Sequence, residues 1–206
     1  MKKELAQRLI AEKAYDVGYS AKLHFSTYEI VEKGPGWIGF VSICVGILSL
    51  IISWLAEKQM SAAVTILGIT GMYIAYYSEK KDDYYAVGQK LTALFNKLKK
   101  LSMTCESSEK VSAEHLSELE NIEHEFNSLC LSKHIFGASW LAHKKFFWEQ
   151  QIGWIDEHLH FNFFRDKIPL SLYITIFGSL VVVLAVLAFN LDLTDLIDHI
   201  QRICTK

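Results

Sequence analysis

The chain has few residues that would end a helix and few that would cross-link it. Its 206 residues include two prolines and 11 glycines, so long helices meet few breakers. The four cysteines are dispersed and form no C-x-x-C pair, which argues against a disulfide framework and against a paired-thiol zinc site. The formal net charge is −2, and without a basic excess we expect no direct binding of nucleic acid.

The sequence also lacks the short motifs that carry enzyme chemistry, namely HExxH, a glycine-rich phosphate loop, GxSxG and the kinase signature. The nearest approach to a metal site is His158 and His160 beside Glu157. Cys130 also lies four residues before His134. Isolated His and Cys residues mostly serve packing or the surface. We therefore predict no catalytic residue, no metal and no cofactor; a membrane enzyme using Glu157, His158 and His160 is an alternative.

What the chain does contain is a pair of uncharged apolar runs, Trp37–Leu55 and Ser61–Ser78, joined by the short connector Ala56–Met60. At about 1.5 Å per residue the first run reaches roughly 28 Å, close to the thickness of a bilayer's hydrocarbon core. Lipid offers the backbone no hydrogen-bond partner, so both runs should be helical. The short connector then predicts a transmembrane helical hairpin over residues 37–78.

A third run, Ile168–Leu191, holds 24 uncharged residues and is predicted to be a third transmembrane helix. The fold class is therefore an all-α membrane protein, with a cytoplasmic helical region at 79–167 and a short external tail at 192–206. Residues 1–36 are predicted to form an amphipathic cytoplasmic helix whose apolar strip packs on the protein's own helices. Gly34, Pro35 and Gly36 are expected to end that helix.

The distribution of Lys and Arg predicts the topology. Six lie before the first span, one in the connector, twelve in residues 79–167 and two after Leu191. The positive-inside rule then puts the N-terminus and the middle region in the cytoplasm of a bacterial inner membrane, and the C-terminus outside.

Small residues recur at helical spacing along both spans of the hairpin. The stripe of the first span is Gly39, Ser42, Gly46, Ser49 and Ser53, and that of the second includes Ser61, Thr65, Gly68, Gly71 and Ala75. Such stripes let helices approach closely in lipid. They can pack within one hairpin, meet other copies of the chain, or line a weakly polar pore. Neither span contains Asp, Glu, Lys, Arg or His, which argues against a pump or a coupled transporter.

Beyond the second span the helix is expected to continue into water. Its apolar residues keep heptad spacing and predict a seam for contact between subunits: Tyr84, Val87, Leu91, Leu94, Leu98 and Leu101. A turn at Ser102–Val111 should precede an acidic helix capped by Ser112, and the basic and acidic helices should pair. The aromatic-rich stretch 140–164 fits either an interfacial helix or an ordinary core.

The order of these elements resembles the SLATT family, the two-transmembrane effectors associated with SMODS and SLOG proteins of bacterial conflict systems. The likeness covers about the first half of the chain. It is carried by the hairpin and by the helix that follows it, from Tyr76-Tyr77 through Tyr84-Tyr85-Ala86 to Leu91, Leu94 and Leu98. The third span departs from the family's two-span pattern.

The resemblance implies an antiphage effector that oligomerises in the membrane and opens a pore or disrupts the bilayer, which kills or arrests the cell. The implied partners are membrane lipid, further copies of the chain, and a sensor protein. That sensor would be a nucleotidyltransferase, a SLOG protein or a reverse transcriptase. The alternative is a non-lytic membrane scaffold or regulatory subunit that recruits a cytoplasmic partner through the acidic helix.

Overall fold

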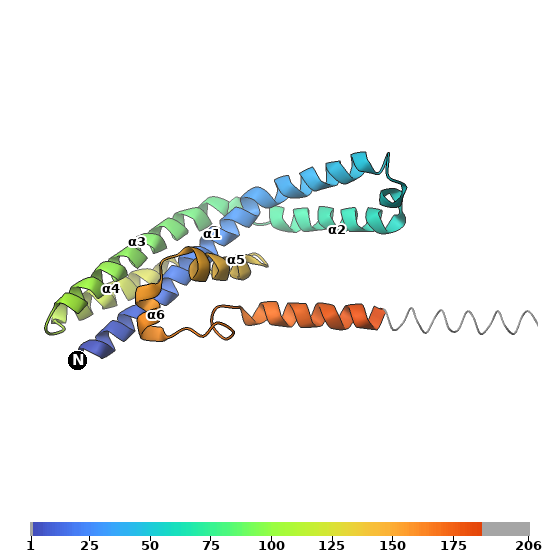
Figure 1. The fold of residues 1–206 in the computed structure, drawn as a ribbon. Helices are drawn as coiled ribbons and strands as arrows, with labels where there is room; N and C mark the ends of the chain where they lie inside the picture. The colour runs from blue at the N-terminus through green and yellow to red at the C-terminus, as the bar shows by residue number, and fades with distance from the viewer. Residues whose placement is uncertain (1, 187–206) are drawn as a thin grey trace, which may run out of the picture. The chain divides into compact units, whose positions relative to one another are not determined.

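The computed structural model describes residues 2–186, and these residues form helices and no strands. They fall into two units, residues 1–162 and the segment from Phe163 onward, which are described separately. Figure 1 shows the helices of the first unit. In chain order they are α1 (Lys3–Leu48), η1 (Ser53–Ala56), α2 (Lys58–Ala75), η2 (Ser78–Lys80), α3 (Lys81–Ser107), α4 (Ala113–Leu129), α5 (Ala138–Lys144), η3 (Lys145–Glu149) and α6 (Gly153–Leu159).

The first helix, α1, runs without a break for 46 residues and passes through the predicted end of the amphipathic helix. The prediction that Gly34, Pro35 and Gly36 end a helix is therefore wrong. Proline removes one backbone hydrogen bond, but this one lies where both flanking segments are held helical. The segment before it packs in the bundle, and the segment after it is an uncharged run that favours helix in lipid.

Gly34 has a packing role that explains its presence within α1. A Cβ built on this residue would lie 2.9 Å from Cδ1 of Ile74 on α2. A side chain at this position would therefore displace the Ile74 side chain. The glycine lies at a close contact between α1 and α2 and does not end a helix.

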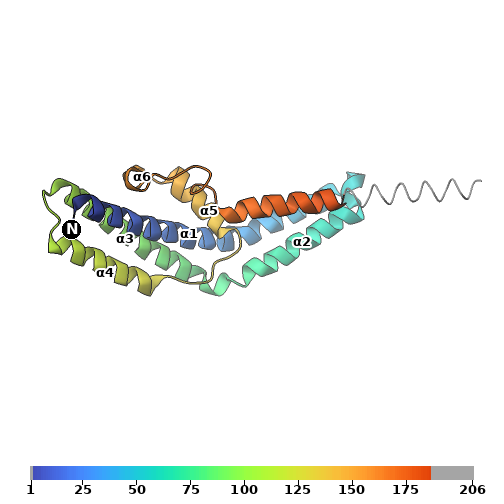
Figure 2. The same ribbon diagram turned by 90° about the horizontal axis from the view of Figure 1, so that it is seen from below.

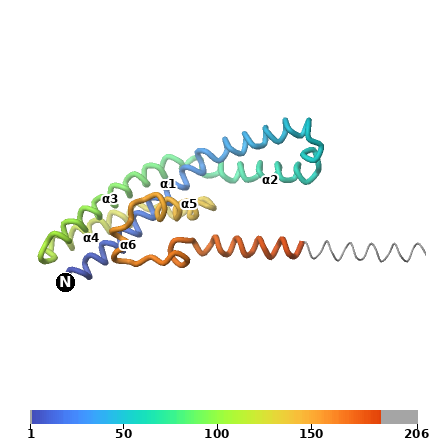
Figure 3. Tube along the Cα trace, in the orientation of Figure 1, coloured from blue at the N-terminus to red at the C-terminus, as the bar shows by residue number. Residues whose placement is uncertain are grey.

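The two arms of the hairpin lie antiparallel and in contact, as the short connector predicts (Figures 1 and 3). The turn, however, is longer than predicted, because α1 ends at Leu48 and not at Leu55. Residues 50–52 form a turn closed by the Ile51 and Ile52 amides, which donate to the Leu48 carbonyl. Among the described helices α1 is long and apolar enough to cross a membrane, whereas α2 meets the same requirement of length and apolar character only together with residues 78–107.

The second arm and α3 do not form one continuous helix, so the prediction that the helix continues beyond the second span is corrected. The chain bends by 40° after Ala75. Ser78 Oγ donates a hydrogen bond to the Ala75 carbonyl, and the Tyr77 amide donates to the Ile74 carbonyl, so the helical repeat tightens into the short turn η2. The bend directs α3 back along the N-terminal half of α1 (Figure 2).

The core of the first unit forms where α3 packs along α1. The apolar strip of α1 is buried inside the chain, as predicted, at Ile10, Ala14, Val17, Ala21 and Val31. α3 continues through the predicted turn and ends at Ser107, because Ser102 and Cys105 lie on the same buried face as Leu98. The predicted helix boundary at Ser102 is therefore corrected to Ser107.

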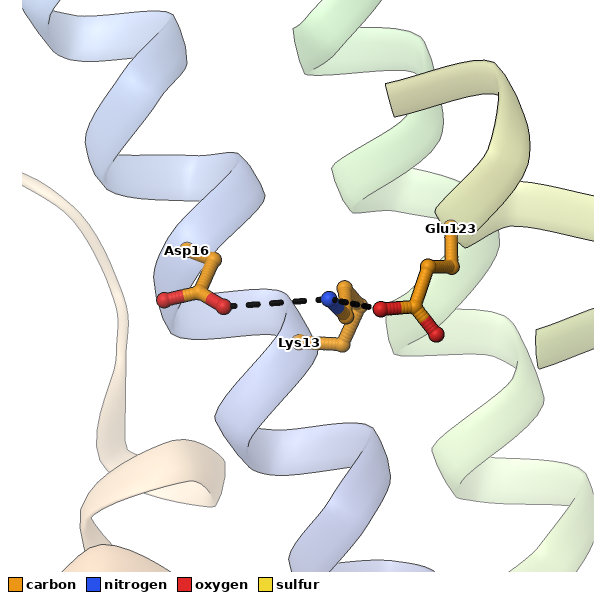
Figure 4. A network of polar contacts seen from close by, with 3 residues as sticks. All are labelled: Lys13, Asp16 and Glu123. Carbon is orange, nitrogen blue, oxygen red and sulfur yellow. Dashed lines mark hydrogen bonds and ion pairs between the residues drawn. The ribbon is translucent and has the colours of Figure 1, made fainter. Parts of the chain in front are cut away.

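The acidic helix α4 packs against α3, and its predicted cap is confirmed. Ser112 Oγ accepts from the His115 amide, and the His115 ring accepts from the Ser112 amide, which completes a capping box. Lys97 on α3 pairs with Glu125 at 3.5 Å, but a second ion pair joins α4 to α1. Figure 4 shows this network, in which Lys13 lies 2.6 Å from Glu123 and 3.9 Å from Asp16.

The aromatic-rich stretch after α4 belongs in large part to the core. Phe146 in the π-helical turn η3 is fully buried and meets Tyr15 edge to face, and Trp154 of α6 packs on Phe95. Trp148, by contrast, is 66% exposed. Of the two alternatives, an interfacial helix and an ordinary core, the structure therefore favours the core for the buried residues of this stretch.

In the second unit, an apolar helix covers Leu170–Val186, which is shorter than the predicted run Ile168–Leu191. Residues 187–191 and the predicted external tail at 192–206 lie outside the described residues. A third membrane span therefore stays a prediction.

Candidate functional site

The outer hairpin, residues 37–78, is the first candidate site, because most of its side chains are exposed in the single chain. No residue of α1 beyond Val31 is buried, and Trp37 at the start of this segment is 65% exposed. Leu50 in the turn is 86% exposed. An apolar surface of this extent is unfavourable in water and favourable in hydrocarbon. Lipid, or other copies of the same surface, would cover it.

Some residues of the small-residue stripes lie between the two arms, and others have no neighbouring atom close by. Ser42, Gly46, Ser49 and Ser61 line a hollow of about 280 Å³ between the arms near the turn. Gly71 faces Ile38, with 3.8 Å from a built Cβ to the nearest atom. A Cβ built on Gly39, Gly46 or Gly68 would meet nothing within 4 Å.

The side-chain hydroxyl groups of Ser49 and Thr65 form hydrogen bonds with backbone carbonyls of their own helices. Thr65 Oγ1 donates to the Ser61 carbonyl, and Ser49 Oγ donates to the Gly46 carbonyl. Ser53 lies in η1 and so does not extend the face of the first stripe, whereas Ala75 is the last residue of α2. The stripes thus leave Gly39 and Gly68 open for close approach by another helix.

The predicted subunit seam lies inside the folded chain. Leu91 and Leu98 have no exposed surface, and Tyr84, Leu94 and Leu101 are buried too, whereas Val87 is half-buried. All of them except Tyr84 share a core with Ile10, Ala14 and Val17 of α1. A contact between copies through this seam would require α1 to leave it.

The second candidate site is the junction where the hairpin meets the bundle. The linker between α4 and α5 is bonded here to all three long helices. The Leu131 amide donates to His24 Nε2 on α1, and the Phe136 amide donates to the Tyr73 hydroxyl on α2. The Tyr84 hydroxyl of α3 donates to the Lys133 carbonyl. Ile135 of the linker is buried with Val31 and Ile74.

Two histidines form the polar centre of this junction. The rings of His24 and His134 meet edge to face with centroids 4.7 Å apart. Because an amide can only donate, His24 Nε2 is an acceptor, and its ring proton lies on Nδ1, which donates to the Ser20 carbonyl at 2.7 Å. Thr27 Oγ1 lies 3.0 Å from His134 Nδ1.

Both imidazoles are held in the neutral form. Burial lowers the pKa of His24, and burial together with the nearby His24 lowers the pKa of His134 to about 4. Nothing in the sequence singles out His24. Apolar periodicity reports which face of a helix is buried but not which polar residue on that face meets a partner more than one hundred positions away.

The weak metal candidates do not assemble into a cluster in the described part of the chain. No three His, Cys, Asp or Glu side chains converge there. Cys130 and His134 lie in the non-helical linker, so their four-residue spacing does not correspond to one turn of a helix. His158 lies at the end of α6, and His160 follows it with φ of 51°.

The comparisons with known proteins agree with this two-armed architecture. The sequence model of a family described as SMODS and SLOG-associating 2TM effector domain 6 (SLATT_6) matches residues 1–176. The likeness therefore extends well beyond the first half of the chain, through the bundle and into the third apolar run. No curated protein and no solved structure matches the chain.

Proposed function

The chain belongs to the SLATT family of 2TM effectors associated with SMODS and SLOG proteins, and we propose that it acts by assembling in the bacterial inner membrane and permeabilising it. Assembly opens a pore or disrupts the bilayer once a partner sensor signals infection, and the cell dies or stops growing. The sensor is a nucleotidyltransferase, a SLOG protein or a reverse transcriptase.

One observation supports this proposal most directly. The two spans of the hairpin are uncharged and mostly exposed. Gly46 borders the hollow between the arms, whereas a Cβ built on Gly39 or Gly68 would meet nothing within 4 Å. In lipid there is no hydrophobic drive between helices, so close backbone approach at small residues supplies the attraction. A single hairpin leaves these positions unused, and neighbouring copies would fill them.

The junction is where we place the coupling between trigger and membrane. The linker forms hydrogen bonds with α1, α2 and α3. A displacement of α4 or α5 would therefore change contacts on both α1 and α2, the two arms of the hairpin. Cytoplasmic placement of the N-terminus and bundle, with residues 168–191 crossing outward, follows from the Lys and Arg distribution. Once α1 has moved, the seam from Tyr84 to Leu101 would serve contact between subunits.

A test compares bulky substitutions at open and control positions. Gly46→Leu and Gly68→Leu should abolish triggered toxicity and membrane depolarisation while leaving insertion intact, because the added side chain blocks helix approach. Ala63→Leu is the matched control: it adds similar bulk on α2 outside the stripe and should leave both readouts unchanged. Full toxicity in both glycine variants would exclude the stripes from the mechanism.

A non-lytic scaffold is the second candidate function, favoured by the surface of α4. Glu114, Glu118 and Glu120 are exposed, and no cation pairs with them in the described part of the chain. This face could receive a basic cytoplasmic partner. A scaffold predicts no depolarisation and no dye entry on triggering, which separates the two functions.

A further inference from the structure

A cavity of about 420 Å³ opens at the bend between α2 and α3. Its lining comes from the end of α2, the turn η2, the start of α3 and the linker after α4: Ala75, Tyr76, Tyr77, Ser78, Glu79, Lys80, Tyr84, Leu131, Ser132 and Lys133. The volume lies within the range of small-molecule sites. Tyr84, Leu131 and Lys133 also form the hydrogen bonds of the junction, but the proposed function assigns no ligand to the cavity.

The cavity lies where the uncharged second arm ends. Ser61–Ser78 contains no charged residue, and Glu79, Lys80 and Lys81 follow at once. Exposed tyrosines at Tyr73 and Tyr76 mark the same level, as aromatic residues do at a membrane interface. With the hairpin in a bilayer, this is the depth of the lipid phosphates on the side of the bundle.

The charges in the lining favour an anion. Lys80 and Lys133 both contribute to the cavity, and in the described residues neither forms an ion pair. The adjacent Lys81 differs, because its ammonium lies 2.5 Å from Glu32. Glu79 is the one carboxylate in the lining and offsets one of the two positive charges.

The polar groups beside the two lysines suit a phosphate ester. Tyr76, Tyr77, Ser78 and Ser132 bring hydroxyl groups into the lining, and Ala75 and Leu131 bring apolar surface. The Lys133 backbone is fixed in place because its carbonyl accepts from the Tyr84 hydroxyl. The cavity thus combines two cations, several hydroxyls and an apolar side at the depth of a lipid headgroup.

We propose that this cavity binds the phosphate headgroup of an anionic phospholipid, with Lys80 and Lys133 as the charge partners. Basic pockets on the cytoplasmic side of membrane helices bind such headgroups. A bound headgroup bridges η2 and the linker and so stabilises the 40° bend between α2 and α3. The proposal requires the hairpin to lie in a membrane but not that it forms a pore.

The test counts lipids on the full-length chain in detergent by native mass spectrometry, with phosphatidylglycerol, phosphatidylcholine and inorganic phosphate added in separate titrations. We expect one phosphatidylglycerol bound with preference over phosphatidylcholine. Lys80→Gln with Lys133→Gln should weaken that binding roughly ten-fold or more, and Glu79→Gln should strengthen it about five-fold. Lys90→Gln with Lys100→Gln is the control, because it removes the same charge from exposed positions of α3 outside the cavity.

Three outcomes would overturn the proposal. One is equal phosphatidylglycerol binding in the cavity and control double variants. Another is equal binding of the two lipids. The third is displacement of the lipid by millimolar inorganic phosphate, which would assign the site to free phosphate. Lipid counting is independent of toxicity, so failure of the pore proposal in the Gly46 and Gly68 variants leaves this measurement unaffected.

Discussion

His24 of α1 and His134 of the linker after α4 meet ring to ring at 4.7 Å in the junction below the hairpin. The Leu131 amide donates to His24 Nε2, the nitrogen that would receive a second proton. Protonation of His24 therefore breaks a bond that attaches the linker to α1. Because burial lowers the pKa of both rings, acid is expected to weaken the junction.

We expect the chain to lose stability as pH falls from about 7.5 to about 5. The folded-state pKa of His134 is about 4, below its ordinary 6.5, and burial lowers that of His24 as well. Below pH 6.5 the unfolded chain takes up protons that the folded chain excludes, so the free energy of unfolding falls with pH. Thermal unfolding in detergent across this range measures the slope.

The matched variant for this prediction is His134→Gln, which removes the titrating ring and keeps a polar side chain. It should flatten the dependence of the unfolding midpoint on pH, even if it lowers the midpoint at pH 7.5. Other titrating groups are common to both proteins and cancel in the comparison. Identical slopes would contradict the assignment.

Gly34→Ala should destabilise the hairpin where Gly36→Ala does not. The new Cβ at residue 34 would lie 2.9 Å from Ile74 Cδ1, whereas nothing lies within 4 Å at residue 36. Overpacking of this kind costs about 1–3 kcal/mol, and an alanine without a clash can gain up to about 1 kcal/mol in a helix. Adding Ile74→Val, which removes Cδ1, should restore much of the loss. Equal effects of the two alanines on the unfolding midpoint would refute the close contact.

Leu94→Ala should destabilise the bundle by about 2–5 kcal/mol, because it leaves a cavity in the packed face of α3. Met103→Ala, on the same helix and 62% exposed, should change the free energy of unfolding by no more than about 0.5 kcal/mol. Denaturant unfolding of the two variants measures both. A small effect at Leu94 would show that this seam is open in the single chain and free for contact between subunits.

The topology can be read with a membrane-impermeant maleimide on intact spheroplasts. In a chain whose sole cysteine is Cys204, we expect labelling from outside. In a chain whose sole cysteine is Cys130, which is exposed on the bundle, labelling should require permeabilisation. If Cys204 also needs permeabilisation, residues 168–191 do not cross the membrane.

The sequence predicted the elements that depend on periodicity. The heptad spacing from Tyr84 to Leu101 and the strip from Ile10 to Val31 both identified buried faces. Ser112 correctly predicted the start of α4. Apolar spacing, however, does not say which surface will cover a face. The α3 seam meets α1 of the same chain, and leucine spacing would look alike for a contact between copies.

Neither the junction nor the unbroken course of α1 could be predicted from the sequence. The contacts of the junction join residues far apart in the chain, such as His24 and Leu131, and no local pattern encodes such a pair. Pro35 predicts a helix end because proline removes one backbone hydrogen bond. Here packing below and an uncharged run above keep α1 intact across Gly34, Pro35 and Gly36.

The unbroken course of α1 has a mechanical consequence. Its 46 residues, roughly 69 Å in length, form one helix that reaches from the bundle into the outer hairpin. Because the two regions share this backbone, a tilt of the first half of α1 moves its second half as well. Under the function proposed above, a sensor that binds the bundle would act on the hairpin directly through α1.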